Sequence, residues 1–99
     1  AQSDSNTRSR GLYYIQRKKL EMNGKLRNER FIKIGLNISY YRRLRGLSQE
    51  QLAEAADISR QWLAQVEAPG LVSPLSIETL FCIADALGVE PAALLDFSR

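Results

Sequence analysis

The possible folds of this 99-residue chain are limited most by a pair of helix-start signals separated by a tight turn. Ser48, with Gln51 three residues later, forms a capping-box pattern, in which each side chain bonds a backbone N–H at the start of a helix. Ser59 is a second N-cap residue. Asp57 lies between the two signals, where the chain must turn, and Asp tolerates a left-handed backbone better than most residues. The predicted helices span about Gln49–Ala56 and Arg60–Glu67.

Further helices are predicted on both sides of this pair. A helical stripe, whose members recur at spacings of four, three and four, precedes it: Ile34, Ile38, Tyr41 and Arg45. Gly46 ends that first helix as a C-cap glycine. Ser76 caps a fourth helix, which Gly88 ends, and Pro91 begins a short fifth one, because its fixed φ and missing N–H suit the first position of a helix. No segment has the pattern of a strand, so the predicted fold class is all-α.

The chain divides into two predicted parts. Residues 31–99 carry the five helices, and residues 1–30 are expected to form a basic N-terminal extension, partly disordered or containing a short helix. Residues 1–11 are polar, which favours disorder. Between Leu12 and Glu29 a helical face is possible, yet Asn23-Gly24 is a turn signal. A short helix, a hairpin and a flexible arm all remain open for that stretch.

Composition argues against an enzyme. The chain has no histidine, the commonest general base and metal ligand, and its single cysteine, Cys82, has no partner for a Cys-His pair, a zinc site or a disulfide. No phosphate-loop or dinucleotide-binding glycine pattern is present. We therefore expect no catalysis, no cofactor and no metal, with Cys82 a partly exposed, unreactive thiol. No apolar run is long enough to cross a membrane, so a cytoplasmic location is expected.

Charge is distributed unevenly along the chain. Residues 1–45 hold twelve Lys and Arg against three acidic residues, a net charge of +9. Residues 46–99 hold two basic and eight acidic residues, a net charge of −6. A basic half suits phosphate or another acidic partner, although a solvated basic tail has the same composition. The charge therefore supports a nucleic-acid function without deciding it.

Taken together, these residues resemble the Xre/Cro family, the DNA-binding domains of phage repressors and many bacterial regulators. The motifs that carry the resemblance are Ile34-Gly35, Tyr41-Arg42, the run from Gly46 to Ala53, Ile58-Ser59-Arg60 and Val66-Glu67. The resemblance covers about residues 32–96. It implies a compact five-helix bundle of the phage-repressor type, which binds double-stranded DNA as a homodimer. The helix over residues 60–67 would be the recognition helix, placed in the major groove.

The resemblance also implies roles for individual residues. Four positions of the recognition helix would face base edges: Arg60, Gln61, Ala64 and Gln65. Their chemistry fits, because Arg pairs bidentately with guanine, Gln pairs with adenine, and a methyl group contacts the thymine methyl. Gln49 would contact backbone phosphate and brace the recognition helix. Ser59 would cap that helix and contact phosphate.

Arg42 and Glu67 match a pair that forms a buried ion pair in several phage repressors. This pair is expected to be structural, and burying either partner alone would cost roughly 3–5 kcal/mol. Three aromatic residues nearby, Tyr40, Tyr41 and Trp62, are expected to pack against the fold rather than to read DNA.

The loop that follows the recognition helix departs from the family pattern. Many relatives carry basic residues there, but residues 68–73 contain no Lys or Arg. A phosphate contact from this loop is therefore missing, and the acidic second half of the chain opposes DNA. Free basic residues of the first helix and of the N-terminal arm are expected to compensate by contacting phosphate: Lys33, Arg43, Arg45 and the cluster Arg17-Lys18-Lys19.

Two functions from different classes fit these observations. The first is a sequence-specific transcriptional regulator, a repressor, that binds a pseudo-palindrome as a homodimer. The alternative is a non-catalytic protein-interaction module, antitoxin-like or antirepressor-like, that retains the fold with weak DNA binding. The loop without basic residues and its apolar pair Leu71-Val72 motivate the alternative. Strong salt-dependent DNA binding favours the first, and a stable complex with a different protein favours the second.

Overall fold

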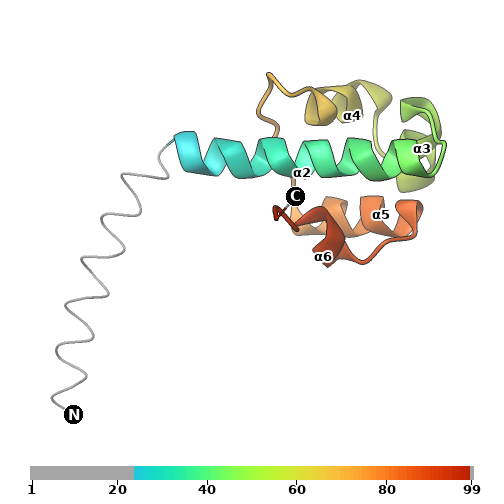
Figure 1. The fold of residues 1–99 in the computed structure, drawn as a ribbon. Coiled ribbons are helices and arrows are strands. Elements are labelled where there is room, and N and C mark those ends of the chain that lie inside the picture. The colour runs from blue at the N-terminus through green and yellow to red at the C-terminus, as the bar shows by residue number, and fades with distance from the viewer. Residues whose placement is uncertain (1–23, 99) are drawn as a thin grey trace, which may run out of the picture.

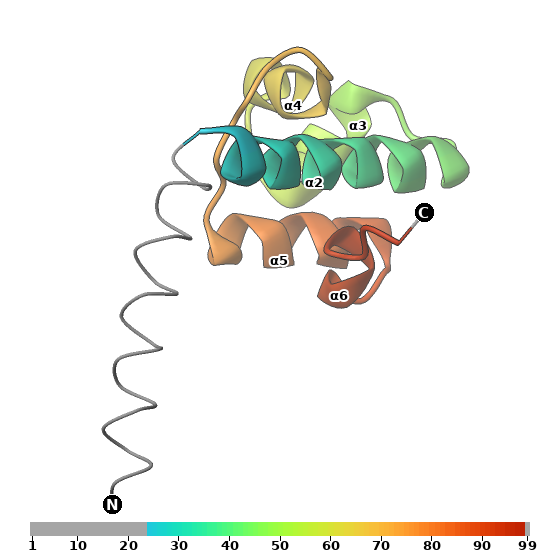
Figure 2. The same cartoon turned by 60° about the vertical axis from the view of Figure 1, so that its left-hand side comes forward.

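The computed structural model describes residues 24–98 and shows the all-α fold that the sequence predicts (Figure 1). Five helices form this part of the chain: α2 (Lys25–Leu44), α3 (Gln49–Ala56), α4 (Arg60–Glu67), α5 (Ile77–Leu87) and α6 (Pro91–Leu94). The long α2 runs through the middle, with α4 on one side and α5 and α6 on the other, as two views 60° apart both show (Figures 1 and 2). α3 packs against both α4 and α5 and closes the bundle.

Every helix contributes to one apolar core. The largest side chains that are almost completely buried come one from each helix: Ile38, Leu52, Leu63, Ile83 and Leu94. Burial of apolar surface is the main favourable term in folding, and each such side chain contributes about 1.5–3 kcal/mol when fully buried. The core therefore joins α3 and α4 to the C-terminal helices as one unit.

The local helix signals are confirmed. Ser48 Oγ accepts the Gln51 backbone N–H at 3.0 Å, and Gln51 Oε1 accepts the Ser48 N–H at 2.8 Å, which completes the capping box. Ser76 Oγ accepts the Thr79 N–H at 3.1 Å. Gly88 ends α5 with φ 69°, a left-handed conformation that glycine adopts without a side-chain clash. These contacts span only three or four residues, which is why the sequence predicts them.

The first helix differs from expectation in two respects. Residues 25–30, which the sequence pattern leaves open, belong to α2, while residues 1–23 of the predicted extension lie outside the described residues. Tyr41 packs against the core as expected, but Tyr40 is 48% exposed. Successive residues of an α-helix lie about 100° apart, so only one of two adjacent tyrosines falls on the buried face. The two rings meet edge to face, with centroids 5.0 Å apart.

Two polar side chains, one in α2 and one just after its end, bind the C-terminal part of the chain, and the sequence pattern did not indicate either contact. The buried Asn37 donates from Nδ2 to the carbonyls of Leu94 at 3.0 Å and Asp96 at 2.9 Å. Arg45 donates from Nε to the Leu87 carbonyl at 2.9 Å, at the C-terminal end of α5, where backbone carbonyls lack helical partners. Within residues 24–98, no helix is both long and apolar enough to cross a membrane.

Candidate nucleic-acid interface

A tight turn held by local hydrogen bonds connects α3 to α4. Asp57 has φ 57° and ψ 48°, the predicted left-handed conformation. Ile58 donates its backbone N–H to the Ala53 carbonyl at 2.9 Å, and the small, buried Ala53 side chain lets the two helices approach closely. Ser59 Oγ accepts the Trp62 N–H at 2.9 Å and caps α4. The position of α4 against α3 is therefore set by backbone geometry and small side chains.

α4 has one buried face and one exposed face. Leu63 and Val66 are buried in the core. Arg60, Gln61 and Gln65 are exposed, and Ala64 is half-buried beside them. Residues four apart on a helix are neighbours, so Gln61 and Gln65 lie side by side on the exposed face. Guanidinium and carboxamide groups each offer paired hydrogen-bonding atoms, which is the chemistry that recognises base edges.

A buried ion pair holds the far end of α4 against α2. Arg42 donates from Nε to Glu67 Oε2 at 2.8 Å and from Nη2 to Oε1 at 2.9 Å, and both residues are buried. The remaining guanidinium nitrogen, Nη1, donates to the Leu47 carbonyl at 2.7 Å. Gln49, at the start of α3, donates from Nε2 to Glu67 Oε1 at 3.2 Å. This network joins α2, α3 and α4, and it connects Gln49 to the end of α4.

α2 and α4 also touch through their backbones at Gly35. A Cβ atom built on Gly35 would lie 1.9 Å from the Val66 carbonyl oxygen, closer than real Cβ contacts. A glycine inside a helix costs about 1 kcal/mol relative to alanine, so this position is used for close approach rather than for helix stability. Gly35 belongs to one of the motifs that carry the family resemblance, but the sequence pattern alone does not show that α4 approaches it closely.

The expected phosphate-contacting residues within the described part of the chain fall into two groups. Gln49 and Ser59 lie at the starts of α3 and α4, and Arg43 is exposed near Glu67 at the end of α4. The structure does not bring the other two to this region. Lys33 lies over the Phe97 ring, with Nζ 5.8 Å from the ring centroid, and Arg45 binds carbonyls at the end of α5. Lys33 and Arg45 were expected to be free, and both are engaged on the opposite side of α2 from α4.

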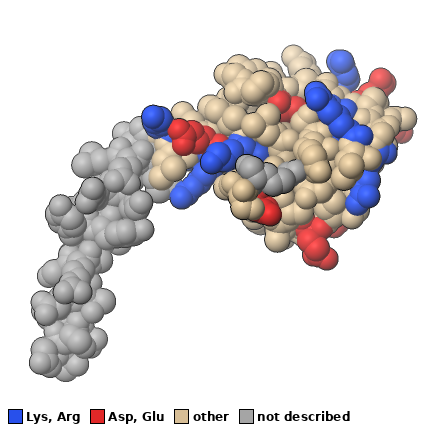
Figure 3. Space-filling model, viewed as in Figure 1, with Lys and Arg blue, Asp and Glu red and all other residues tan. Residues whose placement is uncertain are grey.

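Both signs of charge are visible on the face seen in Figure 3. Lys and Arg side chains spread along the middle band formed by α2, and acidic side chains lie at the lower edge and also at the left and right ends of this face. Leu71 and Val72, in the loop after α4, are 51% and 39% exposed. The Cys82 thiol on α5 is exposed, as expected. Between residues 24 and 98 there is no cluster of His, Cys, Asp or Glu side chains large enough to hold a metal ion.

Comparison with known proteins agrees with this geometry. A sequence model of the helix-turn-helix family matches residues 38–94. The immunity repressor protein of Bacillus phage phi105 is 40% identical over 62 residues, which are 63% of this chain and 42% of the repressor, so the chain spans less than half of that relative's length. The crystal structure of the restriction-modification controller protein C.AhdI from Aeromonas hydrophila is similar, with a TM-score of 0.60 and 31% identity over 65% of this chain and 94% of that one. The chain therefore belongs to the helix-turn-helix family, with the DNA-binding transcriptional regulators of the Xre/Cro type.

Proposed function

We propose that this protein is a sequence-specific repressor that inserts α4 into the major groove of double-stranded DNA. The observation that carries the proposal is the outward face of α4. There Arg60, Gln61 and Gln65 project from a helix whose other face is buried and whose C-terminal end is held by an ion pair. Side chains read bases reliably when the element that carries them is rigid. Ala64, on the same face, contacts a thymine methyl group in this arrangement.

Phosphate contacts fix the register of α4 on the duplex. We infer that Gln49, Ser59 and Arg43 make them, because Gln49 and Ser59 lie at the starts of α3 and α4, and Arg43 of α2 lies near Glu67 at the end of α4. Lys33 and Arg45 are lesser contributors, since each already has a contact on another face. Each neutralised phosphate releases counterions, so a small set of contacts gives modest affinity with a shallow salt dependence.

The active form in this proposal is a homodimer on an inverted repeat. Recognition helices of such dimers lie about 34–36 Å apart, one turn of the double helix. The candidate dimer surface is the end of α6 and the C-terminal segment, where Leu95 is 43% exposed, or the N-terminal extension. One relative is named an immunity repressor and another a restriction-modification controller, and both names are compatible with this function.

Selection from a random duplex library near physiological salt tests the proposal. We expect an enriched inverted repeat whose half-sites are about one helical turn apart. A variant in which Gln61 and Gln65 are both alanine is the matched control, because it changes only the exposed face of α4. An unchanged consensus in that variant would show that α4 does not read the bases. No enrichment at all with the wild-type chain would refute sequence-specific binding.

The second candidate function is a protein-interaction module that retains this fold. The observation that favours it is the loop of residues 68–76, which contains no basic residue and exposes Leu71 and Val72. Weak, sequence-independent DNA binding, together with a stable complex that Leu71→Asp disrupts, would favour this candidate over the repressor.

A further inference from the structure

Trp62, near the start of α4, has a hydrogen-bond donor that no group of the folded domain uses. The residue is half-buried, and its side chain packs against the apolar core. Its backbone N–H bonds Ser59 Oγ, but within residues 24–98 no group accepts the indole Nε1 N–H. None of the described side-chain nitrogen or oxygen atoms is both buried and without a partner, so this N–H reaches the surface of α4.

Trp62 lies at the border of the exposed face of α4. Successive residues of a helix are about 100° apart, so Trp62 falls between the exposed Gln65 and the buried Val66 around the helix axis. The major groove is about 12 Å wide, and a helix with its side chains is about 10–12 Å across. Side chains in the middle of the exposed face therefore meet base edges, whereas those at its border meet the phosphates that line the groove.

The chemistry of the indole group suits a phosphate oxygen. Tryptophan Nε1 is a donor only, and phosphate oxygens are acceptors. Neutral side chains as well as cations make the phosphate contacts that fix a protein on a duplex. Residues 61–98 contain no Lys or Arg, so any phosphate contact from the side chains of this part of the chain comes from a neutral donor.

We propose that the indole N–H of Trp62 donates a hydrogen bond to a phosphate oxygen of the bound duplex. The inference rests on the proposed function, the insertion of α4 into the major groove, and it adds a DNA-contacting residue to the recognition helix. The packed side chain is already held in place, so the contact costs little side-chain entropy. A neutral donor releases no counterion, so the contact adds affinity without making the salt dependence steeper.

Competition binding with Trp62→Phe tests the contact, because Phe keeps an aromatic ring for packing and lacks the N–H donor. Circular dichroism and urea denaturation check that the variant is folded. On the duplex selected by the wild-type chain, we expect binding about tenfold weaker for each bound copy. The same factor is expected on duplexes that carry single base changes, and the slope of affinity against salt concentration should stay that of the wild-type chain.

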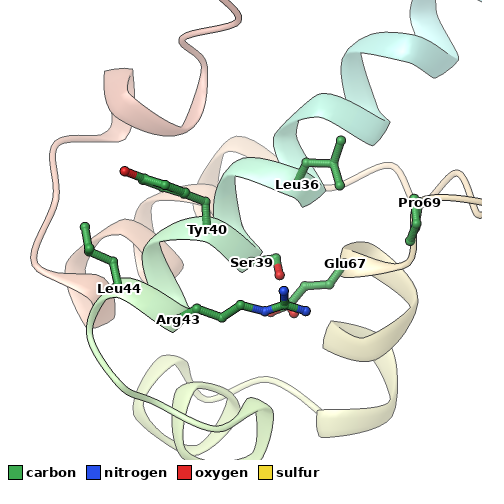
Figure 4. Close-up of a pocket in the computed structure, with 7 residues that line it drawn as sticks. All are labelled: Leu36, Ser39, Tyr40, Arg43, Leu44, Glu67 and Pro69. Atoms are coloured by element: carbon green, nitrogen blue, oxygen red, sulfur yellow. The ribbon is translucent and has the colours of Figure 1, made fainter. Parts of the chain in front are cut away.

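Arg43→Ala is the matched control, because Arg43 is inferred to contact phosphate through its charge. This exposed side chain extends from α2 toward Glu67 at the end of α4 (Figure 4). Its loss should also weaken binding to all sequences alike, but it should reduce the salt slope by about 0.9 for each phosphate. Wild-type affinity in Trp62→Phe would refute the indole contact. A changed base preference in that variant would also refute it, because Trp62 would then act only by positioning α4.

Duplexes in which one phosphate at a time is replaced by an uncharged methylphosphonate give a second readout. One replacement in each half-site should weaken binding of the wild-type chain and leave binding of Trp62→Phe unchanged, because the variant has no donor for that phosphate. Trp62 is the only tryptophan of the chain, so its fluorescence should also change when the duplex is added. Equal sensitivity of both proteins to every replacement would refute the contact alone. A wild-type chain that binds no duplex would refute the proposed function together with the contact.

Discussion

Gly35→Ala is the change that most directly tests how α4 is positioned. The new Cβ would lie 1.9 Å from the Val66 carbonyl oxygen and 3.0 Å from the Val66 carbonyl carbon. Restoring a separation of 3.0 Å from the oxygen requires a displacement of about 1.1 Å. Both atoms belong to the backbone of α4, so no rotamer change relieves the clash and the helix itself must move away from α2.

Two opposing terms set the size of the effect on stability. Overpacking a well-packed site costs typically about 1–3 kcal/mol. Replacing a helical glycine by alanine returns about 1 kcal/mol, because alanine loses less backbone entropy. We therefore expect a net destabilisation of about 0–2 kcal/mol, which most single domains tolerate. The larger consequence is geometric, because Glu67, next to Val66, carries the ion pair that holds the end of α4.

The assay compares unfolding with DNA recognition. Urea denaturation gives the change in stability, and titration with the selected duplex and with a scrambled one gives the specificity ratio. We expect this ratio to fall about tenfold, since a shift of 1 Å misaligns α4 against bases while phosphate contacts persist. Gly70→Ala is the control, because a Cβ there meets no atom within 4 Å. Wild-type stability together with wild-type specificity in Gly35→Ala would refute the close approach of α2 and α4.

Four further changes test other parts of the fold and site. Glu67→Ala leaves the Arg42 guanidinium buried without its carboxylate and is expected to cost about 3–5 kcal/mol in urea denaturation, whereas Arg43→Ala changes stability by less than about 0.5 kcal/mol. Asp57→Val forces a β-branched residue into a left-handed turn and should lower stability by about 1–2 kcal/mol, while Asp57→Gly should not; equal effects would refute the turn geometry. Asn37→Ala removes both bonds to the C-terminal carbonyls and should cost about 1–3 kcal/mol, with faster hydrogen exchange at α6 as the diagnostic sign. Gln61→Ala should relax preference at one base position by about 1–3 kcal/mol in competition binding, and an unchanged preference would mean that Gln61 does not face the bases.

The local framework of this protein follows from short sequence patterns. Ser48, Ser59 and Ser76 each bond a backbone N–H three residues away, and Asp57 turns the chain between α3 and α4. Such contacts depend on residues that are neighbours in the chain, so short patterns predict them. The five helices and the helix-turn-helix unit followed from these patterns, and the family followed from the motifs that carry the resemblance.

The first helix has side-chain contacts that the sequence pattern did not predict. The helical stripe placed Ile34, Ile38 and Tyr41 against the core correctly, but Tyr40, which was also expected to pack, is exposed. Arg45 was expected to be free, although its guanidinium reaches the end of α5. A helical pattern shows that a face exists, but only the neighbouring helices determine how wide the buried part of that face is.

Contacts between residues that are far apart in the chain became visible only in the folded structure. Asn37 bonds Leu94 across 57 positions of the chain, and Gly35 admits the α4 backbone to a distance that no side chain allows. The physical reason is that such contacts depend on how whole helices pack, and packing is set by the shape of the complete core rather than by any short segment. The same packing leaves Leu36 and Leu44 exposed on the outer face of α2.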